Sequence, residues 1–116
     1  LVRKVARDDG AAMRALLSDV AATPGLAEAA TRLRGATEVM LALQVRDPDT
    51  AQSLAVAYLE ACGWILGAWV VARAAEAAAD RAPLWRFYRS RLLPRATARM
   101  LEIETAGALV REPAPV

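Results

Sequence analysis

The residues of this sequence best suited to bind an anion lie in one stretch. Residues 81–99 contain six arginines and no acidic residue, and three aromatic residues stand among them at positions 85, 87 and 88. Arg91, Arg95 and Arg99 are four apart, so they share one face of a helix. Guanidinium groups bind phosphates with two parallel hydrogen bonds. The spacing therefore permits a phosphate-binding stripe, for a nucleic acid or for the nucleotide end of coenzyme A.

A second interpretation of this stretch needs no ligand, and we favour it. The formal net charge of the chain is only +2, which is too small to indicate a nucleic-acid partner by itself. Arginine stems commonly cover apolar surface at an interface or on a solvated face. Arg99 would then pair with Glu102 on the next turn. The contact of Arg91, Arg95 and Arg99 with CoA, with another subunit or with water stays open at this point.

Few other residues have types suited to catalysis. The chain has no histidine and one cysteine, Cys62, so the usual catalytic triads, an internal disulfide and the usual transition-metal ligand sets are missing. Glu60 stands in an apolar segment, where burial would raise its pKa unless an arginine pairs with it. We expect a structural ion pair for Glu60 and a place in the core for Cys62. The sequence thus predicts no catalytic, cofactor-binding or metal-binding residue.

Propensity and periodicity predict helix nearly everywhere. Good helix formers dominate, β-branched and aromatic residues are sparse, and no strand-like alternation is sustained. We expect helices at residues 1–22, 26–46, 50–79 and 83–106. Short turns make sequence neighbours pack antiparallel. The predicted fold class is all-α, an antiparallel up-down-up-down four-helix bundle over residues 1–110, with a flexible tail at residues 111–116.

Several residues should interrupt or end these helices. Gly10 weakens the first half of the first helix, so a break or a delayed start is expected there. Residues 47–50 supply a turn and an N-cap for the third helix. Pro83 suits the first turn of the last helix, and Pro94 should kink that helix. Gly107 is expected to cap its end.

The most apolar segment, residues 54–72, has one charge and approaches the length needed to cross a bilayer. Gly63 and Gly67 also have the spacing of a membrane helix-pairing face. We favour a buried core helix, because Glu60 is costly in lipid and two tryptophans lie well inside the segment instead of at its ends. The glycines would then let a neighbouring helix approach closely.

Short motifs along the chain resemble the end of the long FAD-dependent acyl-CoA dehydrogenases. Just after its catalytic core that family carries a Leu-Val-x-Arg-Lys sequence, and residues 1–5 here differ from it by one residue in spacing. Further matches follow in the family's order: Asp9-Gly10, Tyr58-Leu59 with Gly63 and Trp69, Phe87-Tyr88, Leu93-Pro94, and Ile103 with Gly107. The chain resembles that family's acetyl-CoA dehydrogenase-like C-terminal helical domain.

This resemblance implies that the flavin, the catalytic glutamate and the acyl-CoA cavity belong to a preceding part of a longer protein. None of the family's catalytic residues falls on these positions. We therefore expect a non-catalytic accessory domain of a bacterial, cytoplasmic enzyme of fatty acyl-CoA oxidation. Its expected partners are the upstream catalytic core of the same chain and a neighbouring subunit of a homo-oligomer. FAD is implied for the parent protein, and neither a nucleic acid nor a membrane span is expected.

Two other classes of protein fit the composition. The chain resembles in composition the ligand-binding and dimerisation domain of a bacterial helical transcriptional repressor, which would place a helix-turn-helix immediately upstream. A purely oligomerising module is a third interpretation. The residues preceding Leu1 would separate the first two classes, because one requires a small DNA-binding domain and the other a complete enzyme core.

Overall fold

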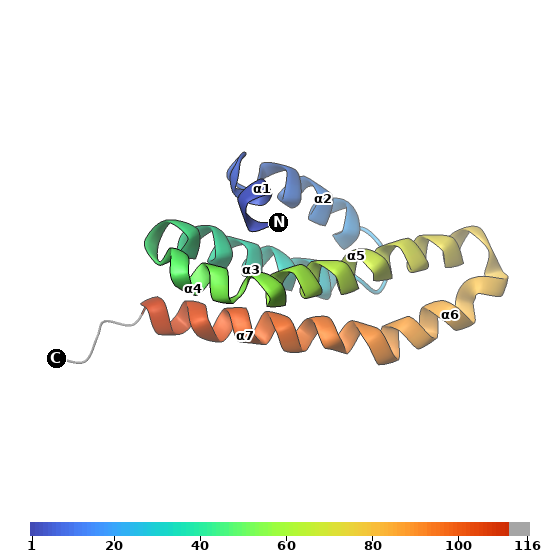
Figure 1. Ribbon diagram of the computed structural model, residues 1–116. Coiled ribbons are helices and arrows are strands. Elements are labelled where there is room, and N and C mark those ends of the chain that lie inside the picture. Colours follow the sequence, from blue (N-terminus) through green and yellow to red (C-terminus); the bar gives the residue numbers. More distant parts are fainter. Residues whose placement is uncertain (112–116) are drawn as a thin grey trace.

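The computed structural model describes residues 1–111, and no strand occurs within them. Three long helices form the body of the molecule, and shorter helices and single turns connect them (Figure 1). Along the chain the elements are α1 (Val2–Ala6), α2 (Ala11–Ala21), α3 (Ala27–Arg46), α4 (Pro48–Ser53), α5 (Ala55–Ala77), the 3-10 turn η1 (Ala79–Arg81), α6 (Ala82–Phe87), the π-helical turn η2 (Tyr88–Leu92) and α7 (Leu93–Arg111). The predicted all-α fold class is confirmed.

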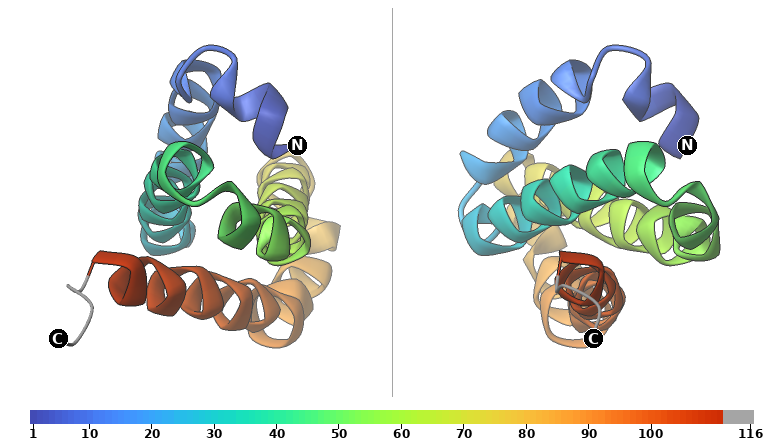
Figure 2. Two further views of the ribbon diagram at one scale, coloured as in Figure 1. Left: turned by 60° about the vertical axis from the view of Figure 1, so that its left-hand side comes forward. Right: turned by 90° about the vertical axis from the view of Figure 1, so that its left-hand side faces the viewer.

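The three long helices α3, α5 and α7 lie against one another, with α1 and α2 on one side of α3 (Figure 1). The chain reverses direction after α3 and again after α5, as the short connections require. Helix α2 makes its main contacts with α3 (Figure 2). The molecule is elongated, with extents of 58, 27 and 19 Å. The closed four-helix arrangement over residues 1–110 stays a prediction.

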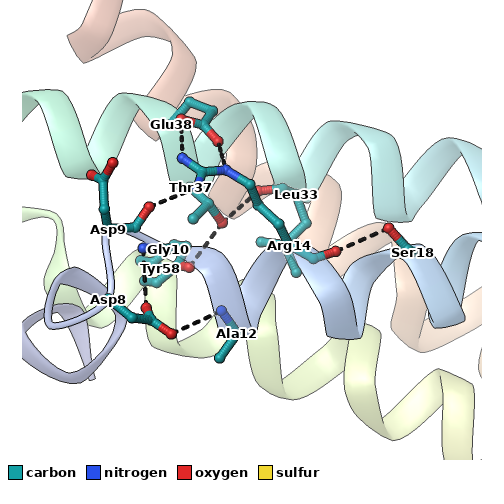
Figure 3. Close-up of polar contacts among 10 residues, drawn as sticks. All are labelled: Asp8, Asp9, Gly10, Ala12, Arg14, Ser18, Leu33, Thr37, Glu38 and Tyr58. Carbon is teal, nitrogen blue, oxygen red and sulfur yellow. Dashed lines mark hydrogen bonds and ion pairs between the residues drawn. The ribbon is translucent and has the colours of Figure 1, made fainter.

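The break expected at Gly10 is confirmed and divides the first predicted helix into α1 and α2. Asp9 and Gly10 both have positive φ angles, 56° and 81°, and this backbone cannot continue a right-handed helix. The carboxylate of Asp8 accepts hydrogen bonds from the backbone N–H groups of Gly10 and Ala12, at 3.2 and 2.9 Å (Figure 3). Asp8 therefore satisfies amides at the start of α2 that have no partner within the helix.

The third predicted helix also begins as expected and is then divided. The Asp47 side chain accepts from Thr50 N at 3.3 Å, and Pro48 occupies the first turn of α4, where a missing N–H costs nothing. A single turn residue, Leu54, separates α4 from α5, which then runs to Ala77. The N-cap prediction for residues 47–50 is confirmed, with Asp47 as the capping residue.

The last predicted helix is irregular where Pro94 disturbs it. Pro94 has no N–H and its ring collides with the carbonyl four residues earlier, at Ser90. The backbone accommodates this in the π-helical turn of residues 88–92, immediately before α7. The helix begins at Ala82 with Pro83 in its first turn, as predicted.

The expected cap at Gly107 is wrong, because α7 continues through Gly107 to Arg111. Gly107 is buried, and a methyl group at this position would lie 2.7 Å from Cγ1 of Val39. The glycine thus permits a close approach of α7 to α3. The tail expected at residues 111–116 lies outside the described residues, except for Arg111, which still belongs to α7.

One apolar core joins these helices. Each long helix contributes side chains that are almost completely buried, such as Leu33 on α3, Ile65 on α5 and Ile103 on α7. Alanines dominate the α5 contribution, so neighbouring helices approach α5 closely. Thr23 and Thr37 are the buried polar residues of the described part of the chain besides Tyr58, and Thr37 is completely buried. The Thr37 hydroxyl contacts Leu33 O and Tyr58 Oη, each at 2.8 Å (Figure 3).

Candidate functional site

Two arginines of the predicted stripe, Arg95 and Arg99, lie beside a contact between Tyr88 of η2 and helix α5. Tyr88 Oη donates a hydrogen bond to the carbonyl oxygen of Trp64 at 3.0 Å. The two rings also meet edge to face, with their centroids 6.3 Å apart. Gly67 makes room for this contact, since a methyl group there would lie 2.5 Å from Tyr88 Oη. The expectation that Gly67 permits a close approach is confirmed, whereas Gly63 has no neighbour within 4 Å of such a methyl group.

Arg95 and Arg99 are placed together beside this contact. The guanidinium carbon of Arg95 lies 5.3 Å from the centre of the Trp64 ring, a cation–π geometry. Arg99 lies between two carboxylates: its Nε is 2.7 Å from Glu60 and its Nη1 is 2.8 Å from Glu102. The predicted Arg99–Glu102 pair and the predicted ion pair of Glu60 are both confirmed. Arg99 therefore shares its charge with two partners inside the domain.

These residues line a groove of about 720 Å³ between α5 and α7. Its lining combines two arginines with one carboxylate, an indole and a phenol, so it carries one more positive than negative charge. The lining residues are Glu60, Gly63, Trp64, Tyr88, Arg95, Ala98 and Arg99. Arg91 is not among them, so the structure brings together two of the three arginines of the predicted stripe.

The other four arginines of the stretch are exposed along η1, α6 and η2. Within the described part of the chain, none of them lies within 4 Å of a carboxylate oxygen. Two large apolar side chains of the same turns are also exposed, Leu84 at 53% and Phe87 at 54%. We call this surface the α6 patch, and it consists of Arg81, Leu84, Arg86, Phe87, Arg89 and Arg91.

Glu60 is not a buried carboxylate. Its side chain is 43% exposed, because it lies on the outer side of α5 at the edge of the groove. The sequence could not show this, since α5 is apolar on its outer side as well as on its inner side. The buried carboxylate considered at position 60 is therefore not found in the structure.

Cys62 and Tyr58 are core residues whose side-chain pKa values are raised by burial. Burial raises the pKa of the Cys62 thiol to about 11, so very little thiolate forms at neutral pH. Burial also raises the pKa of Tyr58, whose hydroxyl meets Thr37. The interpretation of Cys62 as a core residue is confirmed. Within residues 1–111 there is also no group of three His, Cys, Asp or Glu residues placed to hold a metal ion.

Two ion pairs between helices were not predicted. Arg14 on α2 contacts both carboxylate oxygens of Glu38 on α3, with N–O distances of 2.6 and 2.9 Å (Figure 3). Arg32 on α3 contacts Glu104 on α7 in the same manner, at 2.7 and 3.0 Å. Each arginine lowers the pKa of its carboxylate partner. Residues so far apart in sequence carry no local signal of such pairing, which only the packing of the helices creates.

Helix α5 is long and apolar enough to cross a membrane by length and composition, with a mean hydropathy of 1.6 over its most apolar window. Of that window, 39% is buried inside the domain. The inner side of α5 packs against α3 and α7, in agreement with the core-helix interpretation. Its outer side leaves large apolar residues in contact with solvent, which that interpretation did not foresee.

Comparison with known proteins identifies the family of this chain. The structure defines an all-helical domain with its own core. The sequence model of the family described as acetyl-CoA dehydrogenase C-terminal like matches residues 2–112, which is nearly the whole chain, so this chain belongs to that family. The resemblance noted from the sequence is thereby confirmed. No curated protein and no solved structure matches the chain.

Proposed function

We propose that this chain is the non-catalytic C-terminal accessory domain of a cytoplasmic, FAD-dependent acyl-CoA dehydrogenase that takes part in fatty acyl-CoA oxidation. The family match over residues 2–112 is the observation that carries this proposal. A C-terminal domain of that family implies a catalytic core as partner in the same chain. The flavin, the acyl-CoA site and the catalytic base then belong to that core.

The α6 patch is the surface that we assign to contact with the catalytic core or with a neighbouring subunit. Exposed Leu84 and Phe87 supply apolar contact area, and aromatic and arginine side chains are enriched where protein surfaces meet. The arginines around them lack acidic partners within the described residues, so they are available to carboxylates on a partner. Charge complementarity of this kind sets the orientation of two docked surfaces.

A CoA phosphate is a second candidate partner for Arg91, Arg95 and Arg99, and the geometry favours it less. Arg99 already pairs with Glu60 and Glu102, and Glu60 in the same groove would repel a phosphate. Arg95 is stacked on Trp64. Of these three arginines only Arg91 is exposed without such a contact, and one guanidinium makes a weak phosphate site.

The test is to purify the protein encoded by the complete reading frame and to look for bound FAD and for oxidation of acyl-CoA with an artificial electron acceptor. We expect a yellow flavoprotein that transfers electrons from acyl-CoA to the acceptor. The isolated 116-residue chain, as the control, should bind no flavin. A reading frame without a flavoprotein core would contradict the proposal. A helix-turn-helix directly upstream would favour the repressor alternative, which no observation on this chain supports.

A further inference from the structure

Helices α1 and α2 are attached to the rest of the domain mainly through α3. Both lie on the side of α3 that is away from α7, as the two views of Figure 2 show. The three long helices α3, α5 and α7, in contrast, each contact the other two. Removal of α1 and α2 would therefore leave the contacts among the long helices intact. Segments attached in this way can open while the rest of a protein stays folded.

Few apolar side chains hold these two helices in place. Leu17 and Val20 are the buried residues of α2, and Val2 and Val5 are those of α1. The packing also leaves gaps. A hollow of about 70 Å³ lies between α2 and α3, and another of about 300 Å³ lies between the start of α1 and the region of α4. Atoms that line such a gap lose the dispersion contacts they would make in a filled core, so the apolar attachment is weak.

Arg14 makes the one polar connection, among the described residues, between these two helices and the others. Its Nε and Nη2 donate to the two carboxylate oxygens of Glu38 at 2.6 and 2.9 Å. Its Nη1 donates to the carbonyl oxygen of Asp9 at 2.7 Å (Figure 3). We call this set of contacts the Arg14 clamp, and it joins α2, the turn before α2 and α3 at one point. Solvent limits its strength, because both charged side chains are partly exposed.

The backbone ties α1 firmly to α2 and leaves a hinge between α2 and α3. Gly10 N donates to Val5 O at 2.9 Å and also to the Asp8 carboxylate at 3.2 Å, so the turn between α1 and α2 is held by its own hydrogen bonds. In the connection to α3, Pro24 and Gly25 are exposed, and Gly25 has a φ angle of 87°. A glycine at such a position can absorb the backbone rotation of a hinge.

We propose that α1 and α2 form a two-helix flap, residues 2–21, which swings away from α3 as one unit while α3, α5 and α7 stay folded, and that the Arg14 clamp sets how often it opens. Opening exposes the face of α3 that carries Ala30, which lines the hollow beneath α2, and Leu41, which lies against Gly10. The flap thus controls access to an apolar face of α3. The proposal does not depend on the function proposed above, because it follows from contacts within the domain.

Hydrogen–deuterium exchange of the 116-residue chain, followed by mass spectrometry, tests the opening. After correction for intrinsic rates, we expect amides within residues 2–21 to exchange about tenfold or more faster than those in the middle of α5. Low concentrations of urea should speed exchange in α1 and in α2 with one common slope, because one opening exposes both helices. That slope should be smaller than the slope for global unfolding, since less surface becomes exposed.

Arg14→Gln and Arg32→Gln form a matched pair of variants for the clamp. Each removes an arginine that makes two hydrogen bonds to a carboxylate on another helix, and the two side chains are similarly exposed, at 30% and 33%. Arg14→Gln should speed exchange within residues 2–21 about two- to fivefold and leave exchange in α5 and α7 unchanged. Arg32→Gln, whose pair joins α3 to α7, should not speed exchange in the flap relative to α5. Circular dichroism checks that both variants are folded.

Three results would overturn the proposal. If residues 2–21 exchange as slowly as the middle of α5, opening of the flap requires global unfolding. If α1 and α2 respond to urea with different slopes, they do not open as one unit. If Arg14→Gln and Arg32→Gln change the exchange of the flap relative to α5 by the same factor, the Arg14 clamp does not set the opening.

Discussion

Replacing Gly67 by alanine should lower the stability of the domain, even though alanine is the better helix former. A methyl group at position 67 would lie 2.5 Å from Tyr88 Oη, which is well inside contact distance. The phenol would have to move, which breaks its 3.0 Å hydrogen bond to Trp64 O and disturbs the edge-to-face ring contact. The helical turn of residues 88–92 would shift with it.

The magnitude follows from three contributions to the free energy of unfolding. Alanine gains about 1 kcal/mol of helix propensity. Loss of the hydrogen bond costs about 1 kcal/mol, and forcing an extra carbon into a filled contact costs about 1–3 kcal/mol. We therefore expect Gly67→Ala to destabilise the domain by about 1–3 kcal/mol, which lowers the melting temperature by roughly 4–24 °C.

Two further variants isolate the cause. Gly35→Ala is the matched control, because nothing lies within 4 Å of a methyl group at this position in α3, and it should stabilise by up to about 1 kcal/mol. In a Tyr88→Phe background the hydroxyl is gone and the nearest ring carbon is 3.4 Å away, so Gly67→Ala should become neutral or stabilising. Urea unfolding followed by circular dichroism gives the free energy of unfolding of the unmodified chain, of the three single variants and of the double variant. Equal stabilisation by Gly67→Ala and Gly35→Ala in the unmodified chain would refute the reasoning.

Three other perturbations have defined outcomes. Thr37→Val should destabilise by about 1–3 kcal/mol in urea unfolding, because the buried Tyr58 hydroxyl loses its hydrogen bond to Thr37, and Thr37→Val/Tyr58→Phe should recover most of the loss. Arg32 lowers the pKa of Glu104, so their pair stabilises the fold above the unfolded-state pKa near 4.5 and loses this contribution as pH falls through the lower folded-state pKa. Arg32→Gln should therefore cost about 0.5 kcal/mol at pH 7 and nothing at pH 2, and an equal loss at both pH values would contradict this. Arg91→Ala/Arg95→Ala/Arg99→Ala in the complete protein should change its assembly but not its Michaelis constant for acyl-CoA, whereas a large rise in that constant with assembly intact would favour the CoA interpretation.

Local signals in the sequence predicted the helices and most of their ends. Gly10, Asp47 and Pro83 act through the backbone of their own turn, so their effects were visible from residue type and position. The helix end predicted at Gly107 was wrong because this glycine serves a contact between helices. It lies where α7 meets Val39 on α3. Nothing near position 107 in the sequence distinguishes a close helix contact from a helix end.

The candidate site was predictable in part. The four-residue spacing placed Arg95 and Arg99 on one groove and paired Arg99 with Glu102, since these contacts lie within a few turns of one helix. Arg91 falls outside the groove because the π-helical turn that precedes Pro94 changes the rotation of the chain. Contacts between helices, such as Glu60 with Arg99 and Arg95 with Trp64, depend on how α5 and α7 are aligned, which periodicity does not specify.

The central claim is that this domain supports a flavin enzyme without performing its chemistry. The most direct measurement is the rate of flavin reduction at saturating acyl-CoA in the complete protein, compared between the unmodified protein and Glu60→Gln. Glu60 was the one unusual carboxylate that the sequence suggested. We predict a flavin that acyl-CoA reduces, at a rate that Glu60→Gln leaves within about threefold. A protein without reducible flavin, or a loss of about 10²–10⁴-fold on Glu60→Gln as expected for a general acid or base, would contradict the account.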